Sequence, residues 1–224
     1  MKAGLYVVGT PIGNLGDISA RAVNTLREAD AILTEDTRRT RILLDHFGIR
    51  ALTLSCHKFN EASRTAEAVD RIRQGAAWAL VTDSGMPAVS DPGSRMIAAC
   101  RQSGIPVTVI PGPSAVTAAV ALAGFSGGGF LFEGFLPRKS GARARRVSEW
   151  AQSAVPVVVF ESPHRLKALL AEIAAALPGR CVFVGRELTK KFEECLWGTA
   201  QEILETIGER AIKGEIVLVV DSAG

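Results

Sequence analysis

The sequence is poor in the residues that build metal centres and disulfide frameworks. Its 224 residues include four cysteines and three histidines, which lie far apart and form no CxxC pair. Zinc sites need such ligands in clusters, so the spacing argues against a zinc site, and we expect no bound metal. Reduced, mostly buried thiols are the expected state of the cysteines.

Long apolar runs are also missing. The stretch AVTAAVALAG is far shorter than the roughly 20 residues that a membrane span needs, and the N-terminus does not resemble a signal peptide. We therefore expect a soluble, cytoplasmic protein without a membrane partner. The net charge of +3 is too small to imply nucleic-acid binding by itself, and an aromatic content of 6% gives little support to base-stacking platforms.

Short β-branched runs alternate with longer amphipathic stretches along the whole chain. This alternation predicts an α/β fold with mainly parallel sheets and helices on both faces. A run of three glycines at 127–129 interrupts the pattern, which then restarts, so we predict two α/β domains, residues 1–118 and 119–224. Expected strands lie at 4–8, 31–35, 51–55, 77–83, 105–112, 130–135, 156–162, 181–188 and 214–221.

Three loops on one predicted sheet edge are unusual. The first, GTPIGNLGD at 9–17, has neither the glycine spacing nor the following lysine of a phosphate loop, and Asp17 would repel a phosphate. The second, TDSGMPAVSDPG at 82–93, and the third, PGPSA at 111–115, have irregular backbones whose polar groups can face a ligand. Ordinary turns, with Asp17 and Asp91 as helix caps, are the alternative. Together the loops favour a concave binding site.

Taken in order, the segments VGTPIGNLGD, EDTRRT, SCHKFNE, TDSGMPAVSDPG, PGPSA, EGFLPRK, FESPHR and GRELTKKFEE resemble the tetrapyrrole methylase-like (class III) methyltransferases. Within that family the resemblance is to members that modify ribosomal RNA, and it covers residues 5 to about 221. It implies S-adenosylmethionine bound in a cleft between two domains. It also implies methyl transfer to the ribose 2′-hydroxyl of a cytidine in the decoding region of 16S rRNA, within the small ribosomal subunit, by a homodimer.

The resemblance also assigns site residues. Cofactor contacts are expected at Pro11, Asp83, Ser84, Gly85, Met86, Val89, Ser114 and Leu136. Met86 stands where the family usually has threonine, so a side-chain polar contact is not expected there. Many members also continue past the last strand into a small helical extension, whereas this sequence stops at DSAG.

A neutral hydroxyl is a poor nucleophile, so a proton acceptor is expected near it. The candidates are Asp36, His57, Glu61 and Glu187, with His57 or Asp36 preferred. Structural roles are the alternative, since Asp36 can pair with Arg38 or Arg39 and Glu61 can cap a helix.

Arginine and lysine side chains are the expected RNA contacts, because phosphate neutralisation dominates RNA affinity. They are Arg38, Arg39, Arg41, Arg138, Lys139, Arg143, Arg145, Arg146 and Arg165. A solvated charged face is the alternative, and Arg165 can instead pair with Glu161. Two other functions stay open, a small-molecule methylase of the tetrapyrrole or diphthamide type and a non-catalytic ribosome-binding module.

Overall fold

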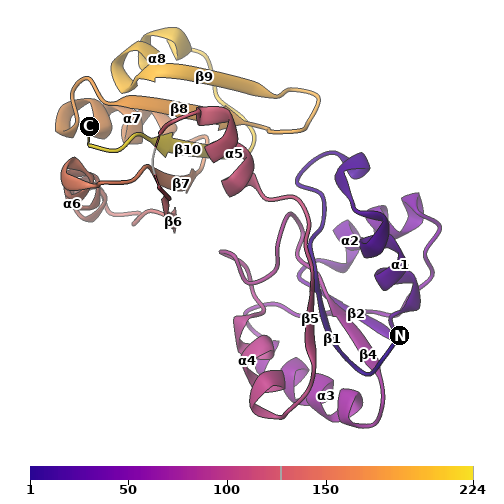
Figure 1. The fold of residues 1–224 in the computed structure, drawn as a ribbon. Helices are drawn as coiled ribbons and strands as arrows, with labels where there is room; N and C mark the ends of the chain where they lie inside the picture. The colour runs from indigo at the N-terminus through magenta and orange to yellow at the C-terminus, as the bar shows by residue number, and fades with distance from the viewer. Residues whose placement is uncertain (127, 224) are drawn as a thin grey trace. The chain divides into compact units, whose positions relative to one another are not determined.

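The computed structural model describes residues 1–126 and 128–223, which form two compact units, Met1–Ser114 and Ala115–Gly224. The glycine run predicted as a hinge begins at residue 127, which lies outside the described residues. The boundary predicted after residue 118 falls inside helix α5 (Ala115–Ala123), and the whole helix belongs to the second unit. Each unit contains one five-stranded sheet with helices packed on it (Figure 1), which confirms the predicted α/β class.

The first unit is built on a fully parallel sheet with the strand order β3-β2-β4-β1-β5. Its strands are β1 (Gly4–Val8), β2 (Ala31–Thr34), β3 (Thr53–Ser55), β4 (Ala77–Leu80) and β5 (Val107–Ile110). Its helices are α1 (Ala20–Glu28), α2 (Thr37–His46), α3 (Glu61–Arg73) and α4 (Ser94–Gln102), with a 3-10 turn η1 (Leu15–Asp17) before α1.

Helices cover both faces of this sheet, so every residue of β2 and β4 is buried, as expected for central parallel strands. One core contains Ile72, Met96 and Cys100 of α3 and α4, and the other contains Leu26 and Leu44 of α1 and α2. The residues that precede helices α1 and α3 differ in whether their side chains cap the helix.

Ser19 caps α1, because its side chain accepts a hydrogen bond from the Ala22 N–H. Asn60 precedes α3 without capping it through its side chain. Asp17 lies in η1 and is not the cap of α1.

The strand order of the first sheet reverses between β1 and β4. From β1 the chain moves outward through β2 to β3, then returns to β4 and crosses to β5. Ligands in open α/β sheets bind outside the carboxyl ends of the strands at such a reversal. The loops that follow β1 and β4 therefore flank the expected site of the first unit.

The second unit has a mixed sheet with the order β6-β7-β10-β8-β9. Its strands are β6 (Leu131–Phe135), β7 (Val157–Glu161), β8 (Cys181–Arg186), β9 (Glu194–Thr199) and β10 (Ile216–Val220). Its other helices are α6 (Ser140–Glu149), α7 (Leu166–Ala176) and α8 (Ala200–Ile207), with a 3-10 turn η2 (Trp150–Gln152).

Strand direction in this sheet differs from the prediction of mainly parallel sheets. Only β6 and β7 pair in parallel, while β10 runs antiparallel to β7 and β8, and β8 antiparallel to β9. The connection from β8 to β9, residues 187–193, is too short for a crossover, which needs a dozen residues or more. The sequence analysis missed β9 and α8, although Thr199 and Glu202 form a complete capping box at the start of α8.

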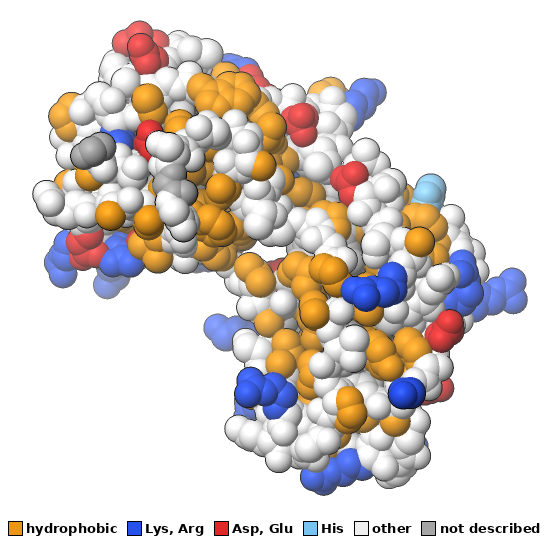
Figure 2. Space-filling model, in the orientation of Figure 1, with side chains coloured by type: hydrophobic (Ala, Val, Ile, Leu, Met, Phe, Trp, Pro, Cys, Tyr) orange, Lys and Arg blue, Asp and Glu red, His pale blue; other side chains and the backbone are white. Residues whose placement is uncertain are grey.

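The faces of the second sheet are covered unequally. Helices α6, α7 and α8 enclose a large core on one face. On the other face the apolar helix α5 contacts β7, β8 and β10, and hydrophobic side chains remain at the surface (Figure 2), among them Phe135 at 61% and Trp197 at 53% exposure. Throughout the described residues, the helices lack either the length or the continuous apolar character needed to cross a membrane.

Candidate functional site

The loops after β1 and β4 are joined directly to each other. Thr10 and Gly85 form an isolated antiparallel bridge, with N–H to carbonyl distances of 2.9 and 3.2 Å. The buried Thr10 hydroxyl also donates to the carbonyls of Thr82, at 3.1 Å, and Gly85. Two of the predicted site loops are therefore fixed together at the strand-order reversal of the first sheet.

A close backbone contact adds the loop after β5. A Cβ atom on Gly9 would lie 2.6 Å from the Met86 sulfur and 2.7 Å from the Gly112 backbone, and a Cβ on Gly112 would meet Gly9 at 2.8 Å. These glycines are required because the loops touch each other, and Pro11 beside them is buried. Met86 serves as a packing residue here, and Ser114 ends the unit half-buried.

The loop at 82–93 has a strained backbone. Ala88 and Ser90 adopt left-handed φ angles of +67° and +64°, which side chains with a Cβ rarely adopt. Hydrogen bonds within the loop stabilise this path, including Thr82 to Asp91 at 2.7 Å and the Ala88 N–H to the Pro92 carbonyl. Val89, between the two left-handed residues, is 42% exposed. Strain of this kind concentrates at ligand sites.

Asp83 links the loop after β4 to the residues after β2. One carboxylate oxygen accepts from the Asp36 N–H at 3.1 Å, and the other lies 3.5 Å from the Arg39 guanidinium. Asp36 itself accepts from Arg38 and caps α2. The hydrogen bonds from Arg38 hold the pKa of Asp36 at about 2, so this carboxylate is a very weak base.

Glu35 was not among the residues predicted from the sequence. Of the carboxylates near the ends of β2 and β4, it is the one best suited to accept a proton. It directly follows β2 and is exposed, and its side chain has no hydrogen bond or ion pair with any described residue. Partial burial, Asp83 and Asp91 all raise its pKa. Its position after a buried strand and before Asp36 was a signal visible in the segment AILTED.

His57 and Glu61 lie in and after the loop that follows β3. The His57 Nδ1 accepts from the Phe59 N–H at 3.3 Å, so in the neutral ring Nε2 carries the proton. Glu61 begins α3, and its carboxylate accepts from the Gly93 N–H at 3.1 Å, at the start of α4. Glu61 therefore connects two helices and does not cap its own.

Glu187 is in the second unit, in the turn between β8 and β9. It has a left-handed φ of +52° and binds the Lys190 ammonium at 2.8 Å and the Glu215 N–H at 2.8 Å. Burial raises its pKa, but these hydrogen bonds outweigh that effect and lower it overall. A Cβ on Gly214 would clash with the Glu187 side chain, so the carboxylate has a structural position in this turn.

Three of the predicted RNA contacts are held in ion pairs within the second unit. Arg143 is 5% exposed and binds Glu172 through two hydrogen bonds of 2.6 and 2.8 Å. Arg146 binds Glu133 at 2.6 Å and also Glu149. A buried guanidinium cannot reach a phosphate, so the RNA-contact prediction is wrong for Arg143.

Arg165 anchors a loop. Its Nη2 pairs with the fully buried Glu161 at 2.5 Å, as the alternative interpretation expected, and its Nη1 donates to the carbonyls of Leu136 and Pro137 at 3.4 and 3.5 Å. The Leu136 side chain is 4% exposed within the core. The predicted cofactor contact at Leu136 would therefore be made by its main chain.

The remaining cations are exposed. Arg38 and Arg39 keep 88% and 62% of their side chains exposed despite their acidic partners. Four others are exposed and form no ion pair with any residue that the structure describes: Arg41, Arg138, Lys139 and Arg145.

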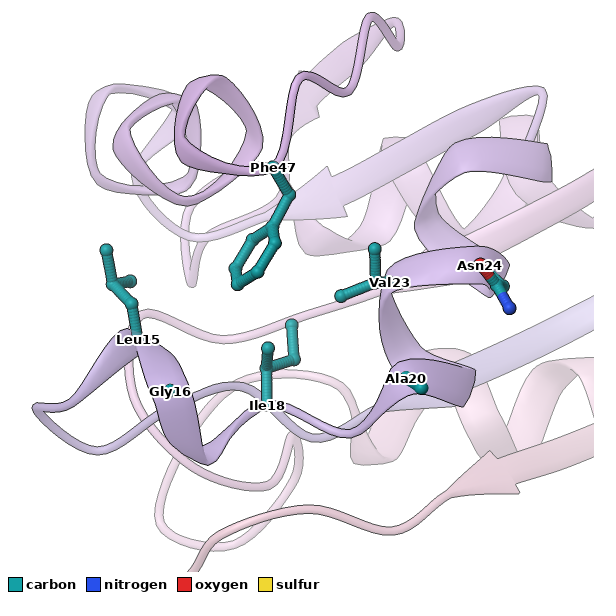
Figure 3. Close-up of a pocket in the computed structure, with 7 residues that line it drawn as sticks. All are labelled: Leu15, Gly16, Ile18, Ala20, Val23, Asn24 and Phe47. Carbon is teal, nitrogen blue, oxygen red and sulfur yellow. The ribbon is translucent and has the colours of Figure 1, made fainter.

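Two further features of the described residues carry no assignment. No group of three or more His, Cys, Asp or Glu among them is arranged to hold a metal ion. A shallow surface pocket of about 340 Å³ lies between η1, the first turns of α1 and Phe47. The Phe47 ring points toward Ile18 and Leu15 (Figure 3). The lining of the pocket is apolar except for Asn24.

Comparisons with known proteins agree with this architecture. The family model of the Tetrapyrrole (Corrin/Porphyrin) Methylases matches residues 4–204. The protein named ribosomal RNA small subunit methyltransferase I from Thermotoga maritima is 44% identical over 96% of this chain and 97% of its own. Its namesake from Halalkalibacterium halodurans is 42% identical over 100% of this chain and 77% of its own.

A solved structure supports the fold. Uroporphyrin-III C-methyltransferase from Thermus thermophilus, complexed with S-adenosyl homocysteine, has a TM-score of 0.67 at 16% identity, with 96% of each chain covered. The family match and the full-length relatives lead to one conclusion. The chain belongs to the tetrapyrrole methylases and, among them, to the ribosomal RNA small subunit methyltransferase I proteins.

Proposed function

We propose that this protein uses S-adenosylmethionine to methylate the ribose 2′-hydroxyl of a cytidine in the decoding region of 16S rRNA. The observation that carries the proposal is the membership of this chain, at 44% identity over nearly its whole length, in a group named for small-subunit rRNA methylation. The strand-end site of the first unit provides residues suited to that chemistry.

The acidic character of this site fits the methyl donor. S-adenosylmethionine, when bound, supplies an activated methyl group on a positively charged sulfonium, beside a cationic ammonium. Asp83 and Asp91 raise the pKa of Glu35, as negative charges close to a carboxylate do. Asp83, the main chain of 84–86 and Val89 are the proposed contacts in the loop after β4.

Glu35 is the proposed proton acceptor. Asp36 is too acidic, because Arg38 holds its pKa at about 2, and His57 uses Nδ1 as an acceptor already. Glu35 is exposed and unpaired among the described residues, and its raised pKa makes it the stronger base. His57 Nε2 is then a hydrogen-bond donor to the substrate.

The RNA would be held by the exposed cations of both units. Three of these cations lie in α2, which follows β2: Arg38, Arg39 and Arg41. In the second unit, Arg138 and Lys139 directly precede α6, and Arg145 lies in the middle of that helix. Phosphate contacts of this kind position an RNA without reading its sequence. Sequence-independent contacts suit a substrate that is presented by the folded small subunit.

The test supplies labelled methyl donor to small subunits from a strain that lacks the gene. We expect label in one cytidine, with alkali-resistant backbone on its 3′ side because the 2′-oxygen is blocked. Asp83→Asn should reduce the affinity for the methyl donor. The control is Asp17→Asn, which changes an exposed aspartate in the loop after β1 and should leave that affinity unchanged. Label on a base, or label on a tetrapyrrole acceptor and none on the subunit, would overturn the proposal.

We also propose that the protein acts in the cytoplasm as a homodimer. The support for a dimer is the exposed apolar surface of the second unit, including Phe135 and Trp197. Sedimentation analysis should give twice the monomer mass of 23.7 kDa, and a monomer at micromolar concentration would contradict the proposal.

A further inference from the structure

The loop after β3 exposes one phenylalanine almost completely. Phe59 is 93% exposed, and the next most exposed large hydrophobic side chains among the described residues, Ile42 and Phe192, reach 65%. Solitary exposed apolar residues are common, so exposure alone assigns nothing. The hydrogen bonds that hold this loop are the second observation.

Hydrogen bonds fix the loop and keep Phe59 at its tip. The Asn60 side chain accepts from the His57 N–H at 2.8 Å and donates to the Ser55 carbonyl at 3.0 Å. The His57 carbonyl accepts from the N–H groups of Asn60 and Glu61, both at 2.9 Å. The Phe59 N–H donates to His57 Nδ1, and the two rings meet edge to face at 6.1 Å. The phenyl ring therefore projects from a hydrogen-bonded turn and stays exposed to solvent.

Exposed cations lie at this part of the sheet edge together with the acidic residues already described. Lys58 is exposed next to Phe59 and forms no ion pair within the described part of the chain. Strand β3 pairs with β2 at Ser55 and Thr34, so the segment with Arg38 and Arg39 begins at the neighbouring strand end. His57 and Arg39 both act electrostatically on Glu35, which places these loops close to the proposed proton acceptor.

An exposed aromatic ring with exposed cations near it has the chemistry of a single-stranded RNA contact. The ring offers a face to an unpaired base, and the cations neutralise the phosphates on either side. A protein partner would instead be expected to bury an apolar patch, whereas Lys58 and the arginines leave Phe59 isolated among charges.

We propose that Phe59 is a stacking platform for an unpaired base of the RNA substrate, next to the nucleotide that is methylated. The inference rests on the proposed function, and it assigns this residue a part in substrate positioning. Stacking orders the RNA strand near Glu35 without specifying which base is present, because every base has a π face.

The test compares four variants for binding to a single-stranded RNA fragment, binding to a duplex of the same sequence, and methyl transfer to small subunits. Phe59→Ala should weaken single-strand binding by about 5-fold to 150-fold, the range measured for loss of one stacked base. Phe59→Leu keeps apolar area but lacks the π face, so it should lose most of the affinity, whereas Phe59→Trp should keep it. Leu52→Ala is the matched control, because Leu52 is 59% exposed in the same unit but precedes β3.

The outcomes separate the inference from the proposed function. If the wild type transfers no methyl group to rRNA, the proposed function fails. If it does, and Phe59→Ala binds single-stranded RNA like wild type, the stacking inference is wrong. Full affinity of Phe59→Leu, or an equal loss on duplex RNA, also contradicts stacking. Loss of activity on whole subunits with unchanged binding to protein-free RNA would assign Phe59 to a protein contact instead.

Discussion

Replacing Arg143 by alanine should unfold the second unit more readily without removing an RNA contact. Its guanidinium makes two hydrogen bonds to Glu172, and the two side chains are 6% and 20% exposed. Breaking such a buried pair costs about 3–5 kcal/mol, because the remaining charge is left unpaired. Water can reach Glu172 in part, so we take the lower end, about 3 kcal/mol. For a unit of this size that lowers the melting temperature by roughly 12 °C or more.

The matched variant is Arg145→Ala, two residues away on α6 with an exposed side chain. It should change the melting temperature little. It should weaken RNA binding and lower the number of counterions released on binding, read from the salt dependence of the affinity, by about one. Calorimetry and RNA titrations at several salt concentrations measure both effects. Exchanging Arg143 and Glu172 together for methionine and leucine should recover most of the lost stability. The reasoning is refuted if Arg143→Ala melts like wild type, or if folded Arg143→Ala loses as much RNA affinity as Arg145→Ala.

Three other predictions concern Gly112, Glu35 and the cysteines. Gly112→Ala should destabilise it by about 1–3 kcal/mol in chemical denaturation, because the new Cβ meets the Gly9 backbone at 2.8 Å; unchanged stability would show that the loops can separate freely. Activity should rise with pH as Glu35 loses its proton, at a higher pH than for an ordinary glutamate because its pKa is raised, and Glu35→Gln should abolish this limb of the profile. Cys181, which is exposed, should react with a thiol reagent in the native state, whereas Cys56, whose pKa burial raises to about 11, should react only after unfolding.

The sequence contained most of the information about the first unit. Its strands are continuous apolar runs and its helices are amphipathic, and Ser19 caps α1 by a short-range rule. In the second unit the sequence analysis missed β9, because its residues ECLWGT alternate weakly and include a glycine. The direction of the strands could not be predicted from local sequence patterns either, because it depends on the pairing of β10 with both β7 and β8.

Loop composition pointed to one sheet edge, where turn residues follow each strand, and the structure joins the loops after β1 and β4 at that edge. The roles proposed for single residues there stay predictions. The partners of charged groups depend on contacts between distant segments, such as Arg143 with Glu172 and Glu61 with Gly93. For the same reason the sequence could not distinguish the paired Asp36 from its unpaired neighbour Glu35.

Helix α5 determines where the chain can be cut into separate pieces. It begins at the first residue of the second unit and covers Val158, Phe183 and Val219, which are fully buried. A fragment that starts at residue 119 would lack the first turn of this cover and should aggregate through the uncovered strands. A fragment that starts at Ala115 keeps the cover intact, so for recombinant expression the difference of four residues should separate an insoluble product from a folded one.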